Sequence, residues 1–386
     1  MRVTHRIFVF ASALAFFAAG ATAACLKSNL TTGVQTDGAA YVLYMPEMSC
    51  WNGNMVVFAH GYVAPSPVLQ VPMDQLSIGG ISLPATFNQL GYGFAASSYS
   101  KNGLAIVEGV HDTMDLVQNV IPVQLQVKPS RVYLIGASEG GLVSVLSAEQ
   151  LPHVYNAAGA ACGPIGSFQG QLNYFGDFRV VFDYFFPKVI PGSPVSIPTE
   201  VQTDWLTVYV PKIELALAAN PGAVAQLIKV TGASVTSDPT TVGETVVGLL
   251  WYNVFATNDA VATLGGQPYD NHHKIYLGSS LDLLLNLKVE RFTASPIAKA
   301  AVAAHYETSG KLNMPTVTIH TTGDPIIPYW QEPLYTLKTL AAGAFFERTP
   351  LPVAAYGHCA FTAGDVLTAF DIMVLRATGL HLDGVE

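Results

Sequence analysis

The sequence predicts an α/β fold with a mainly parallel central sheet flanked by helices. Short apolar runs alternate with stretches of helical periodicity, several runs are apolar throughout, and the alternation resumes after a long middle block. Such alternation is typical of βαβ units with right-handed crossovers, and continuous apolarity indicates strands buried on both faces. The expected strands are 41–44, 55–59, 93–99, 131–135, 157–161, 316–320 and 345–349, and the expected helices are 109–126, 142–151, 331–342 and 363–377.

The alternation stops between 165 and 312. This block is rich first in Pro, Phe and Tyr and then in Ala, with helical periodicity in segments such as 213–219. We expect it to be an inserted, largely helical cap, or lid, over the sheet. The core is then expected to consist of two parts, 25–164 and 313–386.

Residues 1–24 have the pattern of a secretory signal peptide. Arg2 and Arg6 precede an apolar run, and the small residues 21–23 offer a cleavage site. The protein is therefore expected to be secreted, to the periplasm or the cell exterior, without stable membrane insertion. A retained membrane anchor, or a lipid anchor on Cys25, is the alternative.

Composition and charge argue against several classes of partner. The net charge is −9, and Arg2 and Arg6 are the only Lys, Arg, Asp or Glu residues of the first 24, which leaves −11 for the remainder. This balance argues against nucleic acid and anionic membranes. Charged residues make up 12% of the chain. An alanine-rich composition together with the signal peptide explains this low share, and a surface and cleft suited to apolar substrates is the other explanation. Asp270, His272 and His273 form a weak metal-like cluster that we interpret as surface, so no metal or cofactor is expected.

Four cysteines, Cys25, Cys50, Cys162 and Cys359, are consistent with two disulfides in an exported chain. Three pairings are possible. A Cys25–Cys50 bond would attach the N-terminus of the processed chain to the segment before the first central strand, which leaves Cys162–Cys359. Neither the number nor the spacing of the cysteines resembles a zinc site.

The sharpest local signal is a serine between two glycines. Gly136, Ser138 and Gly140 follow the expected strand 131–135 and precede the helical pattern 142–146. A strand, a sharp turn and a helix are the context that a nucleophile elbow requires, because the turn exposes the serine hydroxyl. The glycines keep side-chain bulk away where backbone segments pass closely. Ser138 is therefore the candidate nucleophile, with an ordinary strand-to-helix turn as the alternative.

A serine hydroxyl needs a base, and the base needs a carboxylate that orients it. His358 is the candidate base, in the loop 356–359 between an expected strand and the last helix. Asp324 is the candidate acid, because 321–328 leaves the carboxyl end of a strand, where open α/β sheets build their sites. The alternative for Asp324 is a turn or N-cap aspartate.

The order Ser138, Asp324, His358 resembles the α/β-hydrolase superfamily over most of the chain after the signal peptide. The 186 positions between Ser138 and Asp324 far exceed two or three βα units, so the excess corresponds to the inserted block, and a cap in that place is familiar in the superfamily. The resemblance implies an oxyanion hole made by the backbone N–H groups of Tyr62 and Glu139. The carboxylate of Glu139 must then point away, because it would oppose an oxyanion.

His358-Cys359 also resembles one half of a pattern in the tannase and fungal-type feruloyl esterase family. In that family, a cysteine directly before the serine bonds to a cysteine after the histidine. Here Ala137 precedes Ser138, so the sequence departs from the pattern. Cys162, at the end of the next expected strand, is the residue that could reach Cys359 instead and hold the histidine loop.

These features together predict a secreted carboxylic ester hydrolase that forms an acyl-enzyme. Its substrates are expected to be apolar or aromatic small-molecule or polymer-derived esters, such as feruloyl esters, aryl esters or polyester fragments. Aromatic residues at the start of the block are the substrate-binding candidates, with packing of the cap onto the core as the alternative: Tyr174, Phe175, Phe182 and Tyr184.

Two other functions compete with this prediction. A secreted serine peptidase of the same superfamily, similar to prolyl or tripeptidyl aminopeptidases, uses the same triad. It would present acids for the substrate amine, and Asp177, Asp183 and Glu200 are candidates. A non-catalytic binding protein would lack at least one triad position, and all three positions are filled here.

Overall fold

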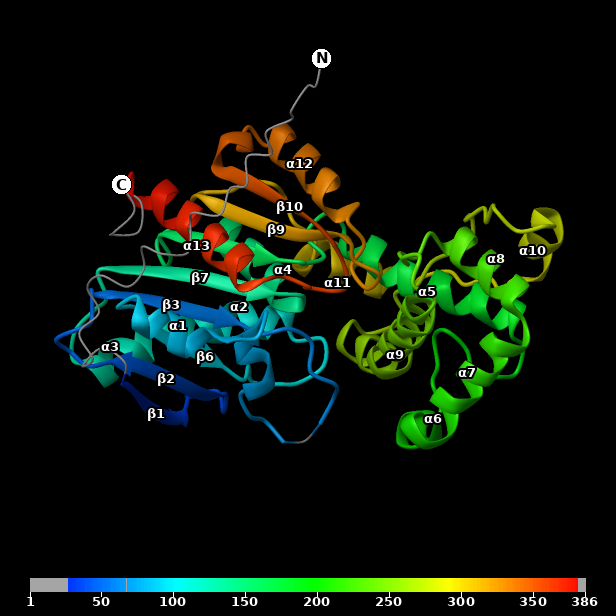
Figure 1. The fold of residues 1–386 in the computed structure, drawn as a ribbon, viewed down its shortest axis with the longest axis horizontal. Helices are drawn as coiled ribbons and strands as arrows, with labels where there is room; N and C mark the ends of the chain where they lie inside the picture. The colour runs from blue at the N-terminus through cyan, green and yellow to red at the C-terminus, as the bar shows by residue number, and fades with distance from the viewer. Residues whose placement is uncertain (1–26, 67, 381–386) are drawn as a thin grey trace, which may run out of the picture.

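A computed structural model describes residues 27–66 and 68–380. Its centre is an eight-stranded sheet in the order β1-β2-β6-β3-β7-β8-β9-β10 (Figure 1). The six strands from β6 to β10 in this order run parallel, and β1 and β2 are antiparallel additions at one edge. The strands are β1 (Ser28–Val34), β2 (Ala40–Pro46), β3 (Asn54–Ala59), β6 (Gly93–Ser97), β7 (Arg131–Ala137), β8 (Ala157–Ala161), β9 (Thr316–Gly323) and β10 (Arg348–Tyr356); β4 (Ser77–Ile78) and β5 (Ile81–Ser82) pair separately.

Strand alternation distributes apolar side chains to both faces of the sheet. In β3, Met55, Val57 and Ala59 belong to one buried cluster, whereas Val56 and Phe58 belong to another on the opposite face. Successive side chains of a strand point to opposite faces, so a continuous apolar run is what a strand covered on both sides needs. The mainly parallel α/β architecture predicted from the sequence is therefore confirmed.

Helices cover both faces of this sheet. α2 (Ile106–Asp115), α4 (Glu139–Gln150) and α12 (Gln331–Ala341) contribute to the cluster on one face. α1 (Leu83–Gln89) and α13 (Ala363–Thr378) contribute to the cluster on the other. The strand order and the two helical layers are those of the α/β-hydrolase fold.

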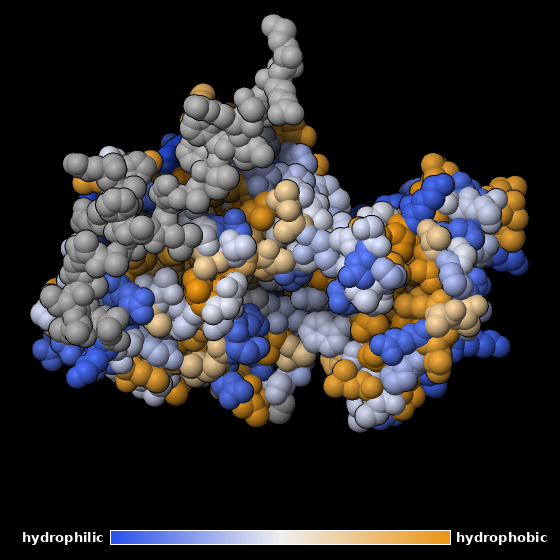
Figure 2. All heavy atoms as spheres, viewed as in Figure 1, coloured by the Kyte–Doolittle hydropathy of each residue, from blue (hydrophilic) through white to orange (hydrophobic). Residues whose placement is uncertain are grey.

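Between β8 and β9 the chain adds no strand to the sheet. It forms α5 (Phe168–Phe185), α6 (Thr199–Thr203), α7 (Val210–Ala219), α8 (Pro221–Thr231), α9 (Thr240–Thr263), α10 (Asp282–Lys288) and α11 (Pro296–His305). Helices α5 to α10 make a lobe beside the sheet (Figure 1), with a buried cluster of its own. We call α5 to α10 the helical lobe. Figure 2 shows apolar residues grouped on its surface.

The helix expected at 109–126 is interrupted. After α2, a π-helical turn, Leu116–Val120, leads into α3 (Ile121–Leu125), which has a proline in its first turn. Pro122 has no N–H to donate and its ring crowds the preceding turn, so the wider turn falls where the regular helix cannot continue.

Two strand predictions need correction. The last strand lies at Arg348–Tyr356 rather than 345–349. It is an edge strand, where Pro350 and Pro352 are tolerated because one side of the strand needs no ladder hydrogen bonds. β1 is absent from the predicted strands, because its two large apolar residues, Leu30 and Val34, are exposed and stand apart among polar neighbours.

The predicted signal peptide, 1–24, and Cys25 lie outside the described residues. Secretion, lipid anchoring and the Cys25–Cys50 bond therefore stay predictions. Within the described ranges, no helix combines the length and apolarity that crossing a membrane requires.

Candidate active site

Ser138 occupies a sharp turn between β7 and α4. Its backbone has φ 57° and ψ −121°, a region that costs a non-glycine residue about 1–3 kcal/mol and persists only where the surroundings enforce it. The Ser138 N–H donates to the Ala161 carbonyl at 2.9 Å, which ties the turn to the end of β8.

The two flanking glycines are required by backbone packing. A Cβ on Gly136 would lie 2.0 Å from the Gly140 carbonyl oxygen, and a Cβ on Gly140 would lie 2.0 Å from the Ala59 carbonyl oxygen. α4 can therefore approach β7 and β3 only without side chains at these positions. The spacing that singled out Ser138 in the sequence reflects this close approach.

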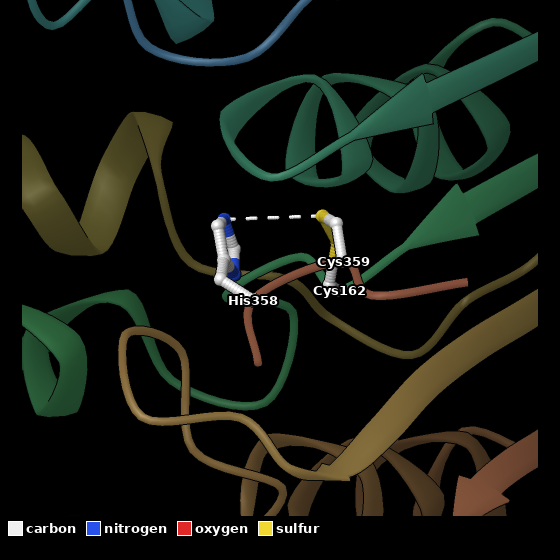
Figure 3. A group of neighbouring side chains, drawn as sticks. All are labelled: Cys162, His358 and Cys359. Carbon is white, nitrogen blue, oxygen red and sulfur yellow. Dashed lines mark hydrogen bonds between the residues drawn. A yellow bond between two sulfur atoms is a disulfide. The ribbon is translucent and has the colours of Figure 1, made fainter. Parts of the chain in front are cut away.

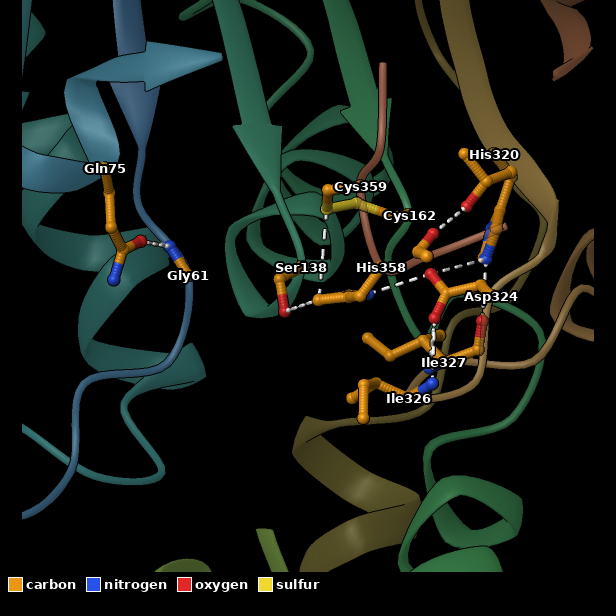
Figure 4. The surroundings of a disulfide bond; sticks show 12 residues. Gly61, Gln75, Ser138, Cys162, His320, Asp324, Ile326, Ile327, His358 and Cys359 are labelled. Atoms are coloured by element: carbon orange, nitrogen blue, oxygen red, sulfur yellow. Dashed lines mark hydrogen bonds and ion pairs between the residues drawn. A yellow bond between two sulfur atoms is a disulfide. The ribbon is translucent and has the colours of Figure 1, made fainter. Parts of the chain in front are cut away.

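Ser138, His358 and Asp324 form one hydrogen-bonded chain (Figure 4). His358 Nε2 lies 2.9 Å from Ser138 Oγ, and His358 Nδ1 lies 2.8 Å from Asp324 Oδ2. Asp324 is completely buried, and its Oδ1 accepts from the N–H groups of Ile326 and Ile327 at 2.8 and 3.0 Å. With the imidazole proton on Nδ1, Nε2 is free to accept the serine proton.

The His358 loop is anchored on both sides of the histidine. Thr321 Oγ1 donates to the Gly357 carbonyl at 2.6 Å, and Cys359 forms a disulfide with Cys162, at the end of β8 (Figure 3). The pairing expected from the sequence is thus present in the structure. Cys162, His358 and Cys359 lie close enough together to hold a metal ion, but the disulfide leaves neither sulfur as a thiolate ligand.

The loop after β3 lies against Ser138. A Cβ on Gly61 would be 3.1 Å from Ser138 Cβ. Gln75 clamps this loop, because its Oε1 accepts the Gly61 N–H at 2.7 Å and its Nε2 donates to the Tyr62 carbonyl at 3.4 Å (Figure 4). Gln75 lies in a segment without a motif, so sequence reasoning missed it.

The Glu139 N–H is the first of α4 and has no acceptor within that helix. The Glu139 side chain points away from Ser138, toward α2. Its Oε1 accepts the Ala105 N–H at 2.9 Å at the N-terminus of that helix, and Oε2 is buried without a partner among the described residues. Burial, with the nearby charges of Asp259 and Glu108, raises the pKa of Glu139 to about 8. The carboxyl group is therefore neutral at pH 7. It would not repel a negative charge that forms next to Ser138, which was the concern about a glutamate at this position.

Helix α9 brings the helical lobe to the triad. The Tyr252 hydroxyl lies next to the Ser138 side chain, and the Tyr252 ring stacks on Phe175 at 5.2 Å. The Tyr62 hydroxyl donates to the Phe255 carbonyl at 3.1 Å. Tyr252 lies in a helix without any catalytic motif, so only the packing of the lobe reveals it.

A pocket of about 380 Å³ opens beside His358. Gly248, Trp251 and Tyr252 of α9 line one side, and Ile326 and Tyr356 line the other. Glu244, one helical turn before Gly248, lies at the same pocket and is exposed to solvent. The wall is thus largely aromatic and aliphatic, with a single carboxylate.

The four aromatic candidates divide into two pairs. Tyr174 donates its hydroxyl proton to the Pro325 carbonyl at 2.9 Å, next to Asp324, and Phe175 stacks on Tyr252. Phe182 is completely buried in the core of the helical lobe, and Tyr184 lines a separate pocket. The structure therefore brings Tyr174 and Phe175 to the site but not Phe182 or Tyr184.

No protein-family profile and no curated protein sequence matches the chain. Among solved structures, Candida antarctica lipase A in its closed state is similar at 14% identity, with a TM-score of 0.47, over 91% of this chain and 77% of the lipase. Feruloyl esterase B from Aspergillus oryzae is similar at 14% identity, with a TM-score of 0.48, over 91% of this chain and 80% of the esterase.

An acylaminoacyl peptidase from Pyrococcus horikoshii is similar at 10% identity, with a TM-score of 0.48. The match covers 93% of this chain but 43% of the peptidase, so this chain spans less than half of that protein's length. Similarity at these identities carries no information about substrate. The α/β-hydrolase fold is defined here by the strand order and by Ser138, Asp324 and His358 at the carboxyl ends of β7, β9 and β10.

Replacing Gly140 with alanine should distort the serine turn. The added Cβ would collide with the Ala59 carbonyl, so we expect the free energy of unfolding to fall by at least about 2 kcal/mol, as for overpacked cores. Gly243→Ala is the matched control, because a Cβ there meets nothing within 4 Å in α9. Chemical denaturation of both variants measures the difference, and equal stability would contradict the close approach described above.

The ionisation of Glu139 should produce an alkaline limb in the activity profile. Because burial raises the pKa of Glu139 to about 8, against 4.5 for an ordinary glutamate, a carboxylate forms beside Ser138 above pH 8. Turnover should then fall by about 10-fold per pH unit. Glu139→Gln should flatten this limb, whereas Glu149→Gln, at the other end of α4, should leave it in place.

The same ionisation should affect stability. The folded chain keeps the Glu139 proton between pH 4.5 and 8 whereas the unfolded chain does not, so the free energy of unfolding should decrease as pH rises through this range. Glu139→Gln should reduce that decrease. An unchanged pH dependence of denaturation would show that Glu139 ionises normally in the folded chain.

Proposed function

We propose that the protein is a secreted carboxylic ester hydrolase that acts through an acyl-enzyme. The observation that carries the proposal is the chain of hydrogen bonds from Ser138 Oγ through His358 to Asp324, at 2.9 and 2.8 Å. A neutral histidine between a serine and a buried carboxylate can take the serine proton. Secretion is supported by the signal-peptide pattern of residues 1–24.

In the proposed reaction, Ser138 Oγ attacks the ester carbonyl carbon while its proton passes to His358 Nε2. The carbonyl oxygen becomes an oxyanion, which the N–H groups of Tyr62 and Glu139 bind. Collapse of this intermediate breaks the ester bond, and the alcohol leaves with the proton from His358. Water then attacks the acyl carbonyl carbon while His358 takes its proton. The bond to Ser138 Oγ breaks, the carboxylic acid is released, and His358 returns the proton to Ser138 Oγ.

The pocket beside His358 supports an apolar or aromatic substrate. Its walls are formed by Trp251, Tyr252, Ile326 and Tyr356, and an aromatic ring buried there would gain apolar contact without leaving polar groups unpaired. The helical lobe acts in this proposal as the cap, 165–312, that the sequence predicted. Small aryl esters, hydroxycinnamoyl esters and fragments of aromatic polyesters have the required chemistry.

The alternative of an aminopeptidase receives less support. Asp177 accepts hydrogen bonds from Tyr269 and Tyr276 and pairs with Lys274. Asp183 pairs with the buried Arg179. These two acids are therefore engaged within the helical lobe rather than available to a substrate ammonium group, and Glu200 is exposed on α6.

A fluorophosphonate probe should label wild-type protein at Ser138, because only an activated serine attacks it. Ser138→Ala should abolish labelling and lower ester turnover by roughly 10⁶-fold, with little change in melting temperature. Ser144→Ala is the matched control, since Ser144 is a buried serine of α4, the helix that follows Ser138. This variant should still be labelled at Ser138. Mass spectrometry of the labelled peptide identifies the site, and turnover that survives in Ser138→Ala would reject the proposal.

Filling the pocket should change the preference among esters. A Cβ on Gly248 meets only the mobile tip of Ile326, at 3.1 Å, so Gly248→Leu should fold and place its side chain in the pocket. We expect kcat/KM for aryl esters to fall by about 10-fold or more relative to short acetyl esters. Gly243→Leu, on open surface of the same helix, should leave the ratio unchanged. An unchanged ratio in Gly248→Leu would remove this pocket from substrate binding.

A further inference from the structure

A buried histidine lies directly behind Asp324. His320, in β9, exposes none of its side chain. Its Nε2 lies 2.8 Å from the Ile327 carbonyl oxygen and 3.6 Å from Asp324 Oδ2 (Figure 4). Because a carbonyl oxygen can only accept a hydrogen bond, Nε2 must carry a proton.

The other ring nitrogen of His320 faces a second buried carboxylate. Nδ1 lies 3.5 Å from Glu332 Oε1, and neither atom has any other hydrogen-bond partner among the described residues. Glu332 Oε2 accepts from Thr318 and from Arg348. Burial would raise the pKa of Glu332, but the hydrogen bond from His320 and the charge of Arg348 outweigh it and lower the pKa.

An ionised Glu332 can only accept hydrogen bonds, so a proton on His320 Nδ1 satisfies both unpartnered atoms. A neutral His320 would instead direct a lone pair at a carboxylate in a site without water contact. This arrangement favours a proton on each ring nitrogen, which would make His320 an imidazolium. Burial would lower the pKa of His320, but the hydrogen bond and charge of Glu332 and the charge of Asp324 outweigh it and raise the pKa.

The charged and titratable groups around His320 balance one another. Asp324 and Glu332 are the carboxylates, from the loop after β9 and from α12, and Arg348 of β10 is the second cation. The Tyr329 and His320 rings are nearly perpendicular, with their centroids 5.8 Å apart. Two positive and two negative groups thus form one buried cluster, which is the condition under which buried charges are tolerated.

We propose that His320 is a positioning residue for the triad: a buried imidazolium that holds the Asp324 turn and offsets part of the Asp324 charge. The Nε2–H bond to Ile327 fixes the turn whose N–H groups bind Asp324 Oδ1. The same cation faces Asp324 Oδ2, the oxygen that binds His358. The kinetic part of this inference rests on the proposed ester hydrolysis, whereas the ionisation of His320 does not.

The offset charge has a consequence for proton transfer. When His358 takes the serine proton, its imidazolium is stabilised by Asp324, and a second cation behind Asp324 weakens that stabilisation. His358 then returns the proton to the leaving alcohol more readily. Removal of the His320 charge should therefore shift the acid limb of the activity profile to higher pH.

The ionisation is tested on the wild-type protein by NMR. In protein labelled with ¹⁵N-histidine, with His320→Gln used for assignment, both ring nitrogens of His320 should carry protons at pH 7. A neutral His320 ring at that pH would overturn the proposal. This measurement needs no substrate, so it stands even if the protein has no esterase activity.

The positioning role is tested by kinetics across pH. His320→Gln should lower kcat by on the order of 100-fold, the loss that a small misplacement of catalytic groups causes, with KM nearly unchanged, and should move the acid limb of kcat/KM to higher pH. Thr318→Val is the control, because Thr318 bonds to Glu332 and Arg348 in the same cluster without reaching Asp324. It should lower stability and leave the acid limb in place.

The outcomes separate the two proposals. An active wild type whose acid limb does not move in folded His320→Gln would overturn the positioning role, because a residue that only packs affects stability and not the limb. If His320→Gln does not fold, Glu332→Gln replaces it as the test variant. This substitution removes one of the charges that keep His320 protonated, so the NMR signal of His320 must then show the loss of a ring proton. Absence of ester turnover and of fluorophosphonate labelling in the wild type would reject the proposed function alone.

Discussion

The hydrogen bond between His358 Nδ1 and Asp324 Oδ2 is the interaction on which the site depends. Asp324 is completely buried, and a buried carboxylate is stable only when donors surround it. Its donors are two backbone N–H groups of its own turn and the ring of His358. The hydrogen bonds of this one carboxylate therefore hold the end of β9 against the loop after β10. The bond to His358 Nδ1 also orients Nε2 of the same ring toward Ser138.

The helical lobe docks on the same turn. Tyr174 donates to the Pro325 carbonyl and Gln171 Nε2 donates to the Ile326 carbonyl, both from α5. Phe175 of that helix stacks on Tyr252 of α9, which lies next to Ser138. The turn after β9 thus positions the carboxylate of the triad and, through α5 and α9, one wall of the pocket. A shift of the lobe would change both together.

The interior shows two ways to bury a carboxyl group in a chain with few charges. Glu139 has one backbone donor and acidic neighbours, so burial prevails and the group stays neutral at pH 7. Glu332 has His320 and Arg348 beside it, so it stays ionised although it is buried as deeply. The difference lies in the partners and not in the depth, because nearby charges and hydrogen bonds compete with desolvation in setting a pKa.

Much of the fold and of the triad could be predicted from the sequence, because the signals act over a few residues. The apolar runs identify the inner strands, and the glycines around Ser138 mark the turn. The departures have local causes as well: Pro122 interrupts the helix expected at 109–126. The last strand was expected too early because Phe345 and Phe346 suggest an apolar strand start, whereas both lie exposed in a short helical turn that precedes Arg348.

The sequence by itself determined the alternation of strands and helices, the turn that exposes Ser138 and the order of the three triad residues. Only the tertiary structure decided which groups surround them: Gln75 on the loop after β3, Tyr252 beside Ser138, and His320 with Glu332 behind Asp324. The physical reason is range. Backbone sterics and apolar periodicity act between near neighbours in the chain, whereas these contacts join segments that meet only when helices and strands have packed.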